Sequence, residues 1–367
     1  MHKTFLISAV ILLSSCNSKN NVSAQTTQEK TSENTQENPT KSDKDTIRIK
    51  AVGDIMLGSN YPSKNGLPNA NILTDVKDIL QDADITIGNL EGALFDEGGT
   101  PKTCQNPSIC YVFRMPKDYG KYLVDAGFDL MSIANNHSGD FGAVGRTETQ
   151  NNLKELGITY AGVAGQCDYN ILEKDGIKYG FIGAGHNNGL VSVSDIDAIQ
   201  KLVKEVKQKA DIVIVMFHGG AEGSKYQHVP KTTEMFYGEN RGNVHNFAHS
   251  CIDAGADIIL GSGPHVTRAV ELYKNKFIIY SMGNFATFGN FNLKGVNGIA
   301  PILDLKINKN GDFISGKIIP TYQVEDTGLG PKIDPEKKVI NTLRDLTQTD
   351  FPEGVLKITD DGMIIKE

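Results

Sequence analysis

The chain has 367 residues, and its 44 acidic side chains outnumber its 37 Lys and Arg side chains, giving a formal net charge of −7 at pH 7. This acidic balance argues against non-specific binding to nucleic acid or to an anionic surface, because both need an excess of positive charge on one face. Beyond the N-terminus the sequence contains no apolar run of the roughly 20 residues that a membrane-spanning helix needs.

Residues 1–15 have the pattern of a short export signal. His2 and Lys3 give a weakly positive start, and the apolar run Phe5–Leu13 is interrupted only by Ser8. That run is too short to span a bilayer and is typical of a signal peptide. It ends in Leu-Ser-Ser-Cys, which resembles the bacterial lipobox, so we expect lipid attachment at Cys16. The alternative is an ordinary secretory signal with a chance cysteine.

The segment after the cysteine is expected to be a lipid-anchored tether. Residues 16–45 are rich in Ser, Thr, Asn, Gln, Lys and Glu, with almost no apolar residue. Such a segment buries too little surface to offset its chain entropy and is predicted to be disordered. Asn17 stands where the best-known inner-membrane retention signal has Asp, which favours the outer membrane in a two-membrane bacterium. We therefore expect an extracytoplasmic protein, lipid-anchored to the cell membrane or the outer membrane.

Residues 46–298 show a repeated strand design. In four segments an Asp precedes a short apolar strand and a polar cluster follows it: Asp84–Glu91, Asp129–His137, Asp211–His218 and Asp257–His265. A fifth strand, Ile47–Val52, runs into Gly53 and Asp54. Apolar runs without polar alternation are typical of strands buried on both faces.

Amphipathic helices separate several of these strands. They are predicted over Val144–Leu156, Asp195–Ala210 and Val244–Ala254. The alternation of strands and helices indicates a largely parallel sheet. Hairpins over Tyr169–Ile182 and Val270–Ser281 add antiparallel pairs, so we expect an α/β fold with mixed, largely parallel sheets flanked by helices.

Residues 299–367 are predicted to form a C-terminal α+β extension packed on the main domain. It contains a hairpin around Asn310-Gly311 and a helix near Pro335–Leu346. Elsewhere, Cys104 and Cys110 share one loop and can form a disulfide in an oxidising compartment. Cys167 and Cys251 lack the spacing of a metal cluster and are expected to be buried thiols.

Polar residues follow the predicted strands at their carboxyl ends, where ligands bind in folds of this class. They are Asp54, Glu91, Asn136, His137, His218 and His265. This set of oxygen and nitrogen ligands without thiolate suits one or two divalent ions of Mn, Fe or Zn. Each residue also has a structural alternative: a turn or cap for Asp54, a turn for the Asn pair, a hydrogen-bonded role for His218. Their shared position favours one site.

Seven motifs in chain order resemble the CapA family, which is linked to poly-γ-glutamate capsule synthesis and is similar to calcineurin-like metallophosphoesterases. The motifs are Gly53-Asp54-Ile55-Met56, Asn89-Leu90-Glu91-Gly92, Ala134-Asn135-Asn136-His137-Ser138, Phe217-His218-Gly219-Gly220, Ile252–Asp257, Gly263-Pro264-His265-Val266 and Tyr280–Phe285. The resemblance covers residues 47–300 and implies an αββα sandwich of the metallophosphoesterase type.

The resemblance also implies roles for the strand-end residues. It places metal ligands at Asp54, Glu91, Asn136, His218 and His265 and a proton-donating role at His137. The sequence departs from the phosphoesterase pattern in two places. Asp54 is followed by Ile and Met instead of an Asp-x-His motif, and the closing motif has a single His. These departures remove two imidazoles and favour one ion or a weaker pair.

A polar segment between the fourth and fifth motifs contains Glu222 and Arg241, which we consider as candidates for substrate binding. Arg241 stands beside Glu239 at an expected helix start, where it can clamp a carboxylate or phosphate. The alternative is a solvated loop of mixed charge.

Three functions are compatible with these features. The first is a metal-dependent, phosphoesterase-like hydrolase that acts in capsule or poly-γ-glutamate biosynthesis at the envelope. The second is a non-catalytic assembly or export factor that binds an envelope polymer and contacts the capsule biosynthesis machinery. The third, a periplasmic solute-binding protein, usually has two similar lobes, and no duplicated half is visible in the sequence.

Overall fold

The computed structural model describes residues 45–104, 110–325 and 329–367. The predicted signal, Cys16 and most of the tether lie outside the described residues. Within the described residues, no helix combines the length and the apolar character that a membrane span requires.

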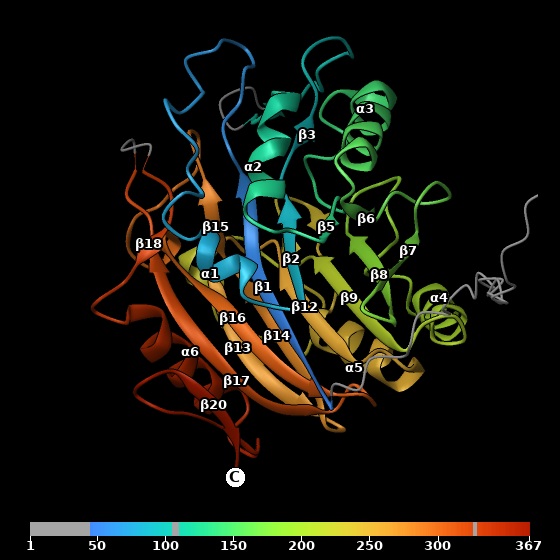
Figure 1. The fold of residues 1–367 in the computed structure, drawn as a ribbon, viewed down its shortest axis with the longest axis vertical. Helices are drawn as coiled ribbons and strands as arrows, with labels where there is room; N and C mark the ends of the chain where they lie inside the picture. The colour runs from blue at the N-terminus through green and yellow to red at the C-terminus, as the bar shows by residue number, and fades with distance from the viewer. Residues whose placement is uncertain (1–44, 105–109, 326–328) are drawn as a thin grey trace, which may run out of the picture. The chain divides into compact units, whose positions relative to one another are not determined.

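Two mixed sheets form the centre of the fold (Figure 1). The first has the order β19-β20-β17-β16-β1-β2-β5-β6, with β15 beside β1 and β18 beside β17. Its strands are β1 (Thr46–Met56), β2 (Ile85–Leu90), β5 (Leu130–Ser132), β6 (Thr159–Ala161), β15 (Asn284–Thr287), β16 (Ile299–Asn308), β17 (Phe313–Tyr322), β18 (Lys332–Ile333), β19 (Leu356–Ile358) and β20 (Met363–Lys366). The strands β15, β1, β2, β5 and β6 are parallel, and the C-terminal strands pair antiparallel.

The second sheet has the order β13-β14-β12-β9-β8-β7. Its strands are β7 (Tyr169–Lys174), β8 (Ile177–Gly185), β9 (Ile212–His218), β12 (Ile258–Ser262), β13 (Thr267–Tyr273) and β14 (Lys276–Met282). The four central strands are parallel, and each edge strand closes a hairpin. Two small pairs accompany the sheets: β3 (Ala93–Leu94) with β4 (Arg114–Met115), and β10 (Met235–Phe236) with β11 (Glu239–Asn240).

Six α-helices flank the sheets within the described part of the chain. They are α1 (Lys77–Gln81), α2 (Gly120–Asp125), α3 (Gly142–Glu155), α4 (Ile196–Lys207), α5 (Val244–Ala254) and α6 (Lys338–Asp350), with 3-10 turns at η2 (Lys117–Tyr119), η3 (Ser224–Tyr226) and η4 (Gly295–Gly298). Helices α1 to α3 contribute to the core on the outer face of the first sheet, and α4 and α5 to that of the second. The predicted αββα sandwich is confirmed.

The continuous apolar strands arise because both faces of each sheet are buried. In β9, Ile212, Ile214 and Met216 belong to the core between the sheets, whereas Val213 and Val215 pack with the residues of α4 and α5. Side chains alternate between the faces of a strand, so a strand covered on both sides needs apolar residues at every position. This is the physical basis of the strand pattern in the sequence.

The helix predictions agree in position with the structure, except that α4 ends at Lys207 instead of Ala210 and the C-terminal helix is shifted. Helix α5 matches its predicted range and ends at Gly255, whose φ of 117° is left-handed. The C-terminal helix begins at Lys338 and ends at Asp350, later than predicted. The reason is that Lys337 adopts a left-handed φ of 56°, while Asp334 accepts hydrogen bonds from the backbone N–H groups of Glu336 and Lys338.

The C-terminal residues continue the first sheet. Strand β16 pairs antiparallel with β1 from Thr46↔Asn308 to Ala51↔Leu303. Helix α6 places Val339, Ile340 and Leu343 in the core between the two sheets. This part of the chain therefore completes the layer from which β1 presents Asp54.

Candidate metal centre

Asp54 lies in strand β1 at the point where the strand that pairs with β1 changes. The first half of β1 pairs with β16, and from Asp54 onwards it pairs with β15. The Asp54 N–H donates to the carbonyl oxygen of Gly283 at 2.9 Å. A Cβ at position 53 would collide with the same carbonyl, so only glycine permits this approach. Asp54 is consequently fixed at the carboxyl end of the parallel strands.

A chain of amides holds two carboxylates side by side. Asn89 of β2 donates through Nδ2 to Asp54 Oδ1 at 2.8 Å and to Glu91 Oε2 at 2.5 Å. Asn135, which follows β5, donates to Asn89 Oδ1 at 3.0 Å and to the carbonyl oxygen of Leu90 at 2.8 Å. These polar side chains are all buried, so the network sets the orientation of both acids.

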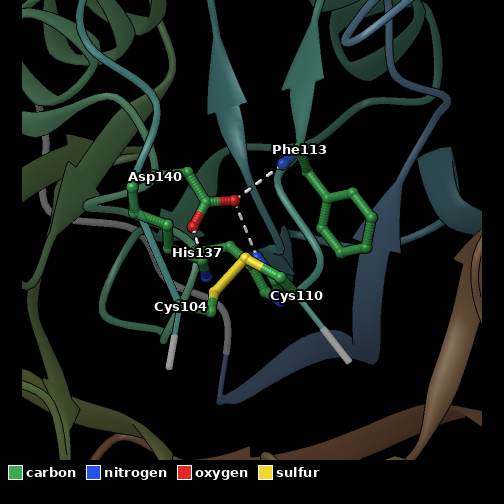
Figure 2. The surroundings of a disulfide bond; sticks show 6 residues. Cys104, Cys110, Phe113, His137 and Asp140 are labelled. Carbon is green, nitrogen blue, oxygen red and sulfur yellow. Dashed lines mark hydrogen bonds and ion pairs between the residues drawn. A yellow bond between two sulfur atoms is a disulfide. The ribbon is translucent and has the colours of Figure 1, made fainter. Parts of the chain in front are cut away.

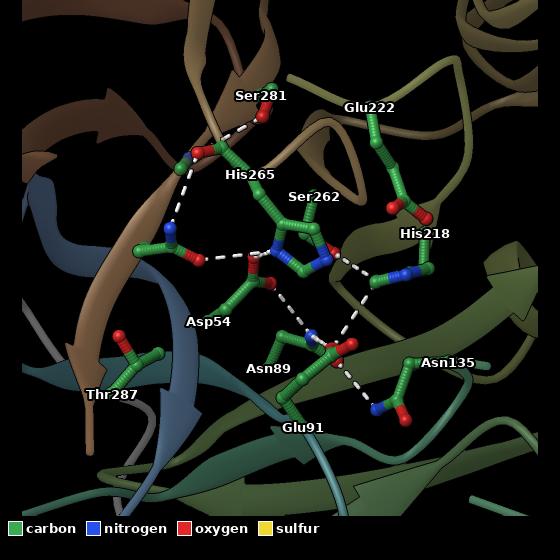
Figure 3. Close-up of polar contacts among 12 residues, drawn as sticks. Asp54, Asn89, Glu91, Asn135, His218, Glu222, Ser262, His265, Ser281 and Thr287 are labelled. Carbon is green, nitrogen blue, oxygen red and sulfur yellow. Dashed lines mark hydrogen bonds and ion pairs between the residues drawn. The ribbon is translucent and has the colours of Figure 1, made fainter. Parts of the chain in front are cut away.

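Two imidazoles from the second sheet face these acids (Figure 3). His265 Nδ1 lies 2.9 Å from Asp54 Oδ2 and 3.1 Å from Asn284 Oδ1. His218 Nδ1 lies 3.4 Å from Glu91 Oε2 and 3.2 Å from the hydroxyl of Ser262. His265 has a left-handed φ of 55°, an uncommon conformation that is concentrated at functional sites.

The donor atoms at this point fit a divalent cation. Ligand atoms of Glu91, His218 and His265 lie within 4.8 Å of one another. Glu91 Oε1 and His218 Nε2 are buried and have no hydrogen-bond partner among the described residues. An unsatisfied buried polar atom costs about 1–3 kcal/mol, and coordination to a cation would remove that cost. Imidazole and carboxylate donors suit Mn, Fe or Zn.

The pKa shifts at the centre follow from burial and from its own charges. Burial and the neighbouring charge of Asp54 raise the pKa of Glu91 well above its ordinary value. Burial and the nearby His186 lower the pKa of His218 well below its ordinary value. Burial opposes a charge on His265, but the hydrogen bond and charge of Asp54 outweigh it and raise its pKa to about 10. A bound cation would favour an ionised Glu91 and neutral imidazoles.

His137 is held by Asp140 near the disulfide between Cys104 and Cys110 (Figure 2). Its Nδ1 lies 2.8 Å from Asp140 Oδ2, which also accepts from the Phe113 N–H at 2.7 Å. Lys102 Nζ lies 2.6 Å from Asp140 Oδ1. The Phe113 ring packs on the imidazole with centroids 4.3 Å apart. Burial lowers the pKa of His137, although the charge of Asp140 opposes this effect.

Four cysteines lie within the described residues, and the structure settles whether Cys104 and Cys110 are paired. Cys104 and Cys110 form a disulfide, and Cys167 and Cys251 are buried free thiols. Lys102 and Phe113, which flank the disulfide-closed segment on either side, both contact Asp140. The disulfide therefore closes the loop that helps to orient His137.

Arg241 is already paired in the structure. Arg241 Nη1 donates to Glu222 Oε1 at 2.6 Å, and Nη2 lies 2.9 Å from Glu239 Oε2. Arg241 is buried and lies just before α5, whose N-cap is Asn243. Figure 3 shows the Glu222 carboxylate pointing towards His218 and His265. The positive charges of His265 and Arg241 outweigh the effect of burial and lower the pKa of Glu222.

The structure brings together most of the predicted site residues. Contacts join Asp54 to His265 and Glu91 to His218. Asn136 is different, because no hydrogen bond among the described residues joins its side chain to these four. Its Oδ1 atom is nevertheless buried without a hydrogen-bond partner in the described part of the chain.

Sequence reasoning missed His186, which follows β8 at the same sheet edge. Its Nδ1 lies 3.3 Å from the carbonyl oxygen of His218, and its ring stacks on that of His218 with centroids 6.0 Å apart. Burial and the charge of Arg241 lower its pKa to about 4. The available signal was the sequence Gly-Ala-Gly-His at the end of an apolar strand. Asp140 and Asn284 were also missed as residues that orient imidazoles.

Comparison with known proteins gives the family of the chain. A family model described as "Bacterial capsule synthesis protein PGA_cap" matches residues 48–288, which include the strand-end residues. The chain belongs to this family. The "Capsule biosynthesis protein CapA" of Bacillus anthracis is 28% identical over 259 residues, which is 65% of this chain and 59% of that protein.

A second relative gives a similar alignment. The "PGA biosynthesis protein CapA" of Bacillus subtilis (strain 168) is 28% identical over 257 residues, covering 66% of this chain and 63% of the relative. The chain therefore spans under two thirds of the length of these two relatives. Among solved structures, a hypothetical protein from Thermus thermophilus matches at 18% identity with a TM-score of 0.45, covering 76% of this chain and 100% of that one.

Proposed function

We propose that this protein takes part in the biosynthesis of a capsular polymer of the poly-γ-glutamate type, through a metal-dependent, hydrolase-like centre at the strand ends. The observation that carries the metal centre is the pair of unpartnered buried atoms, Glu91 Oε1 and His218 Nε2, within one group of ligands among the described residues. The polymer class is supported by the family match and by the names of the two Bacillus relatives.

Glu91, His218 and His265 would hold the ion, with Asp54 and Asn136 as further oxygen ligands. When bound, an ion of Mn, Fe or Zn supplies Lewis acidity towards a phosphoryl or carbonyl oxygen. Asn89 fixes the orientation of both carboxylates, and Asn284 with Asp54 fixes that of His265. The protein thus presents a pre-oriented ligand set, which reduces reorganisation during reaction.

His137 would exchange a proton with the substrate. Asp140 occupies Nδ1, which leaves Nε2 as the nitrogen available to a reacting group. Burial lowers the pKa of His137 and favours the neutral imidazole, which would accept a proton from water first and could donate it afterwards, in the donor role that the resemblance implies. Phe113 limits the movement of the ring. His137 is therefore assigned to acid–base chemistry and Asp140 to its orientation.

Glu222 and Arg241 would form one wall of the substrate site. A carboxylate or phosphate of the substrate would compete with Glu222 and Glu239 for the Arg241 guanidinium. An Arg fork binds such groups through two parallel hydrogen bonds. The ion pairs with Glu222 and Glu239 hold the Arg241 guanidinium in an orientation in which a substrate anion could replace one of these carboxylates.

The proposal includes a location outside the cytoplasm. Lipid on Cys16 and a polar tether over residues 16–45 would hold the centre within reach of envelope polymer. Stable anchoring needs more than one acyl chain. Labelling with a radioactive fatty acid tests this part: incorporation is expected in the wild type and not in Cys16→Ala, and an unlabelled wild type would refute it.

A non-catalytic binding role is the second candidate. It is favoured by the occupation of both Asp54 oxygens by Asn89 and His265, and by Met56, which is buried where the phosphoesterase pattern has a His. In this case the polymer would bind at the same rim without needing His218 or His137, and the protein would deliver it to the biosynthetic machinery.

Surface polymer in the native bacterium distinguishes the two candidates. We expect His218→Ala and His137→Ala to abolish polymer while the protein remains at its normal abundance by immunoblot. His228→Ala is the matched control, because His228 is an exposed histidine paired with Asp350. Normal polymer with both His218→Ala and His137→Ala would overturn the enzyme and favour the binding factor.

A further inference from the structure

A second cluster of metal-binding side chains lies on the helix-covered face of the second sheet. His245 and His249 lie one turn apart on α5, and Glu271 lies on the edge strand β13. Their ligand atoms lie within 4.8 Å of one another. Glu271 pairs with Ile278 near the amino end of β14, whereas the first centre lies at the carboxyl ends of the parallel strands. The two clusters are therefore different sites.

The side chains of the cluster converge, and His249 and Glu271 form a hydrogen-bonded ion pair. His249 Nε2 lies 3.0 Å from each carboxylate oxygen of Glu271. Two ligands of a tetrahedral zinc ion with bonds near 2.0–2.1 Å lie about 3.3 Å apart. The rings of His245 and His249 have centroids 4.1 Å apart, as expected for positions i and i+4 on one helix face. A bound ion would replace the hydrogen bonds between His249 and Glu271.

The ring nitrogen atoms of His245 are available to bind a ligand. The described residues provide it with ring contacts but with no hydrogen-bond partner. His249 and Glu271 are 21% and 13% exposed at their side chains, so the cluster is reachable from solvent without being fully hydrated. A half-buried imidazole without a partner beside a carboxylate and a second imidazole is a ready ligand.

Neighbouring aromatic residues orient the three side chains. Tyr280 donates its hydroxyl to Glu271 Oε2 at 2.6 Å. The ring of Tyr273 stacks on His249 with centroids 3.8 Å apart, and Phe351 stacks on His245 at 6.1 Å. A hydrogen bond to a ligating carboxylate is the usual support behind a metal site, and it raises affinity by fixing the ligand.

We propose that His245, His249 and Glu271 form a zinc site in which solvent completes the coordination. Two imidazoles and one carboxylate without thiolate suit Zn²⁺. Asn246 follows His245, so the helix lacks the Glu that acts as base in His-Glu-x-x-His hydrolases. An ion bound here would tie α5 to β13, and Tyr280 orients Glu271. The site is independent of the proposed function.

Zinc titration of the full-length protein, purified in detergent and stripped of metal, tests the site. A chromophoric chelator competes for Zn²⁺ in the wild type, in His245→Gln and in His228→Gln as control. We expect His245→Gln to bind one equivalent less than the wild type and His228→Gln to match the wild type. Tyr280→Phe is expected to lower the affinity for this equivalent of Zn²⁺ about 10-fold. Equal stoichiometry and affinity in His245→Gln and the wild type would overturn the proposal.

A second measurement does not depend on the stability of that variant. In His218→Gln, which impairs the first centre, X-ray absorption at the zinc edge should show scattering from two imidazoles. A zinc spectrum without imidazole scattering would refute the site. If His218→Gln retains this zinc, the ion is bound outside the first centre. The two proposed sites can therefore be tested separately.

Discussion

Glu234 offers a sharp test of how the segment that carries Glu222 is held. Its carboxylate accepts from Arg268 Nη1 at 2.9 Å and Nη2 at 2.8 Å, and from the Ala221 N–H at 3.0 Å. The Arg268 side chain is fully buried, and that of Glu234 is 6% exposed. Such a pair makes its largest difference to stability when one partner is removed, because the other charge stays buried.

The change Glu234→Ala would leave the Arg268 guanidinium with only two backbone carbonyl partners among the described residues, those of Tyr226 and Ala221. Breaking a buried ion pair in this way costs about 3–5 kcal/mol. That is a large part of a typical unfolding free energy of about 5–15 kcal/mol. The control Glu239→Ala removes a half-exposed carboxylate from Arg241 and should cost about 0–1 kcal/mol.

Urea unfolding followed by circular dichroism, together with amide hydrogen exchange, measures both variants. For Glu234→Ala we expect a lower free energy of unfolding and faster exchange over residues 221–234. For Glu239→Ala both quantities should stay close to the wild type. The reasoning is refuted if Glu234→Ala unfolds within about 1 kcal/mol of the wild type and its exchange over residues 221–234 is unchanged.

Three other changes have defined outcomes. Gly53→Ala should unfold about 1–3 kcal/mol more easily in urea, because its Cβ meets the Gly283 carbonyl; wild-type stability would contradict that contact. Replacing Cys104 and Cys110 together by Ala should lower the unfolding free energy by about 2 kcal/mol, and no change would exclude a stabilising disulfide. Burial raises the pKa of the Cys251 thiol, so its stabilising contribution is complete below its ordinary value of 9.0 and is lost as the pH rises further. Unfolding free energy should therefore fall less steeply above pH 9.0 in Cys251→Ala, and equal slopes would contradict this assignment.

The residues at the strand ends could be predicted because the same pattern, an apolar strand followed by a polar residue, recurs along the sequence. Each apolar strand is followed by a polar residue, and parallel strands place those residues at one edge. This reasoning brought Asp54, Glu91, His218 and His265 together, as the structure has them. The buried sheets were predictable for the same reason, since strands covered on both faces need apolar residues throughout.

The missed residues depend on contacts that spacing does not encode. His186 follows a strand expected only as half of a hairpin, but β8 also pairs parallel with β9 and so ends at the site. Asp140 contacts Lys102 and the Phe113 N–H, which are both distant from it in the sequence. Asn284 reaches His265 because β15 lies beside β1. Each case needs the tertiary arrangement.

Metal content of the full-length protein is the most direct test of the strand-end centre. Elemental analysis for Mn, Fe and Zn should compare the wild type with His218→Gln and with the control His228→Gln. We predict that His218→Gln retains at least one equivalent less than the wild type, whereas His228→Gln retains the same amount. Equal metal content in His218→Gln and the wild type would contradict a metal centre built on Glu91, His218 and His265.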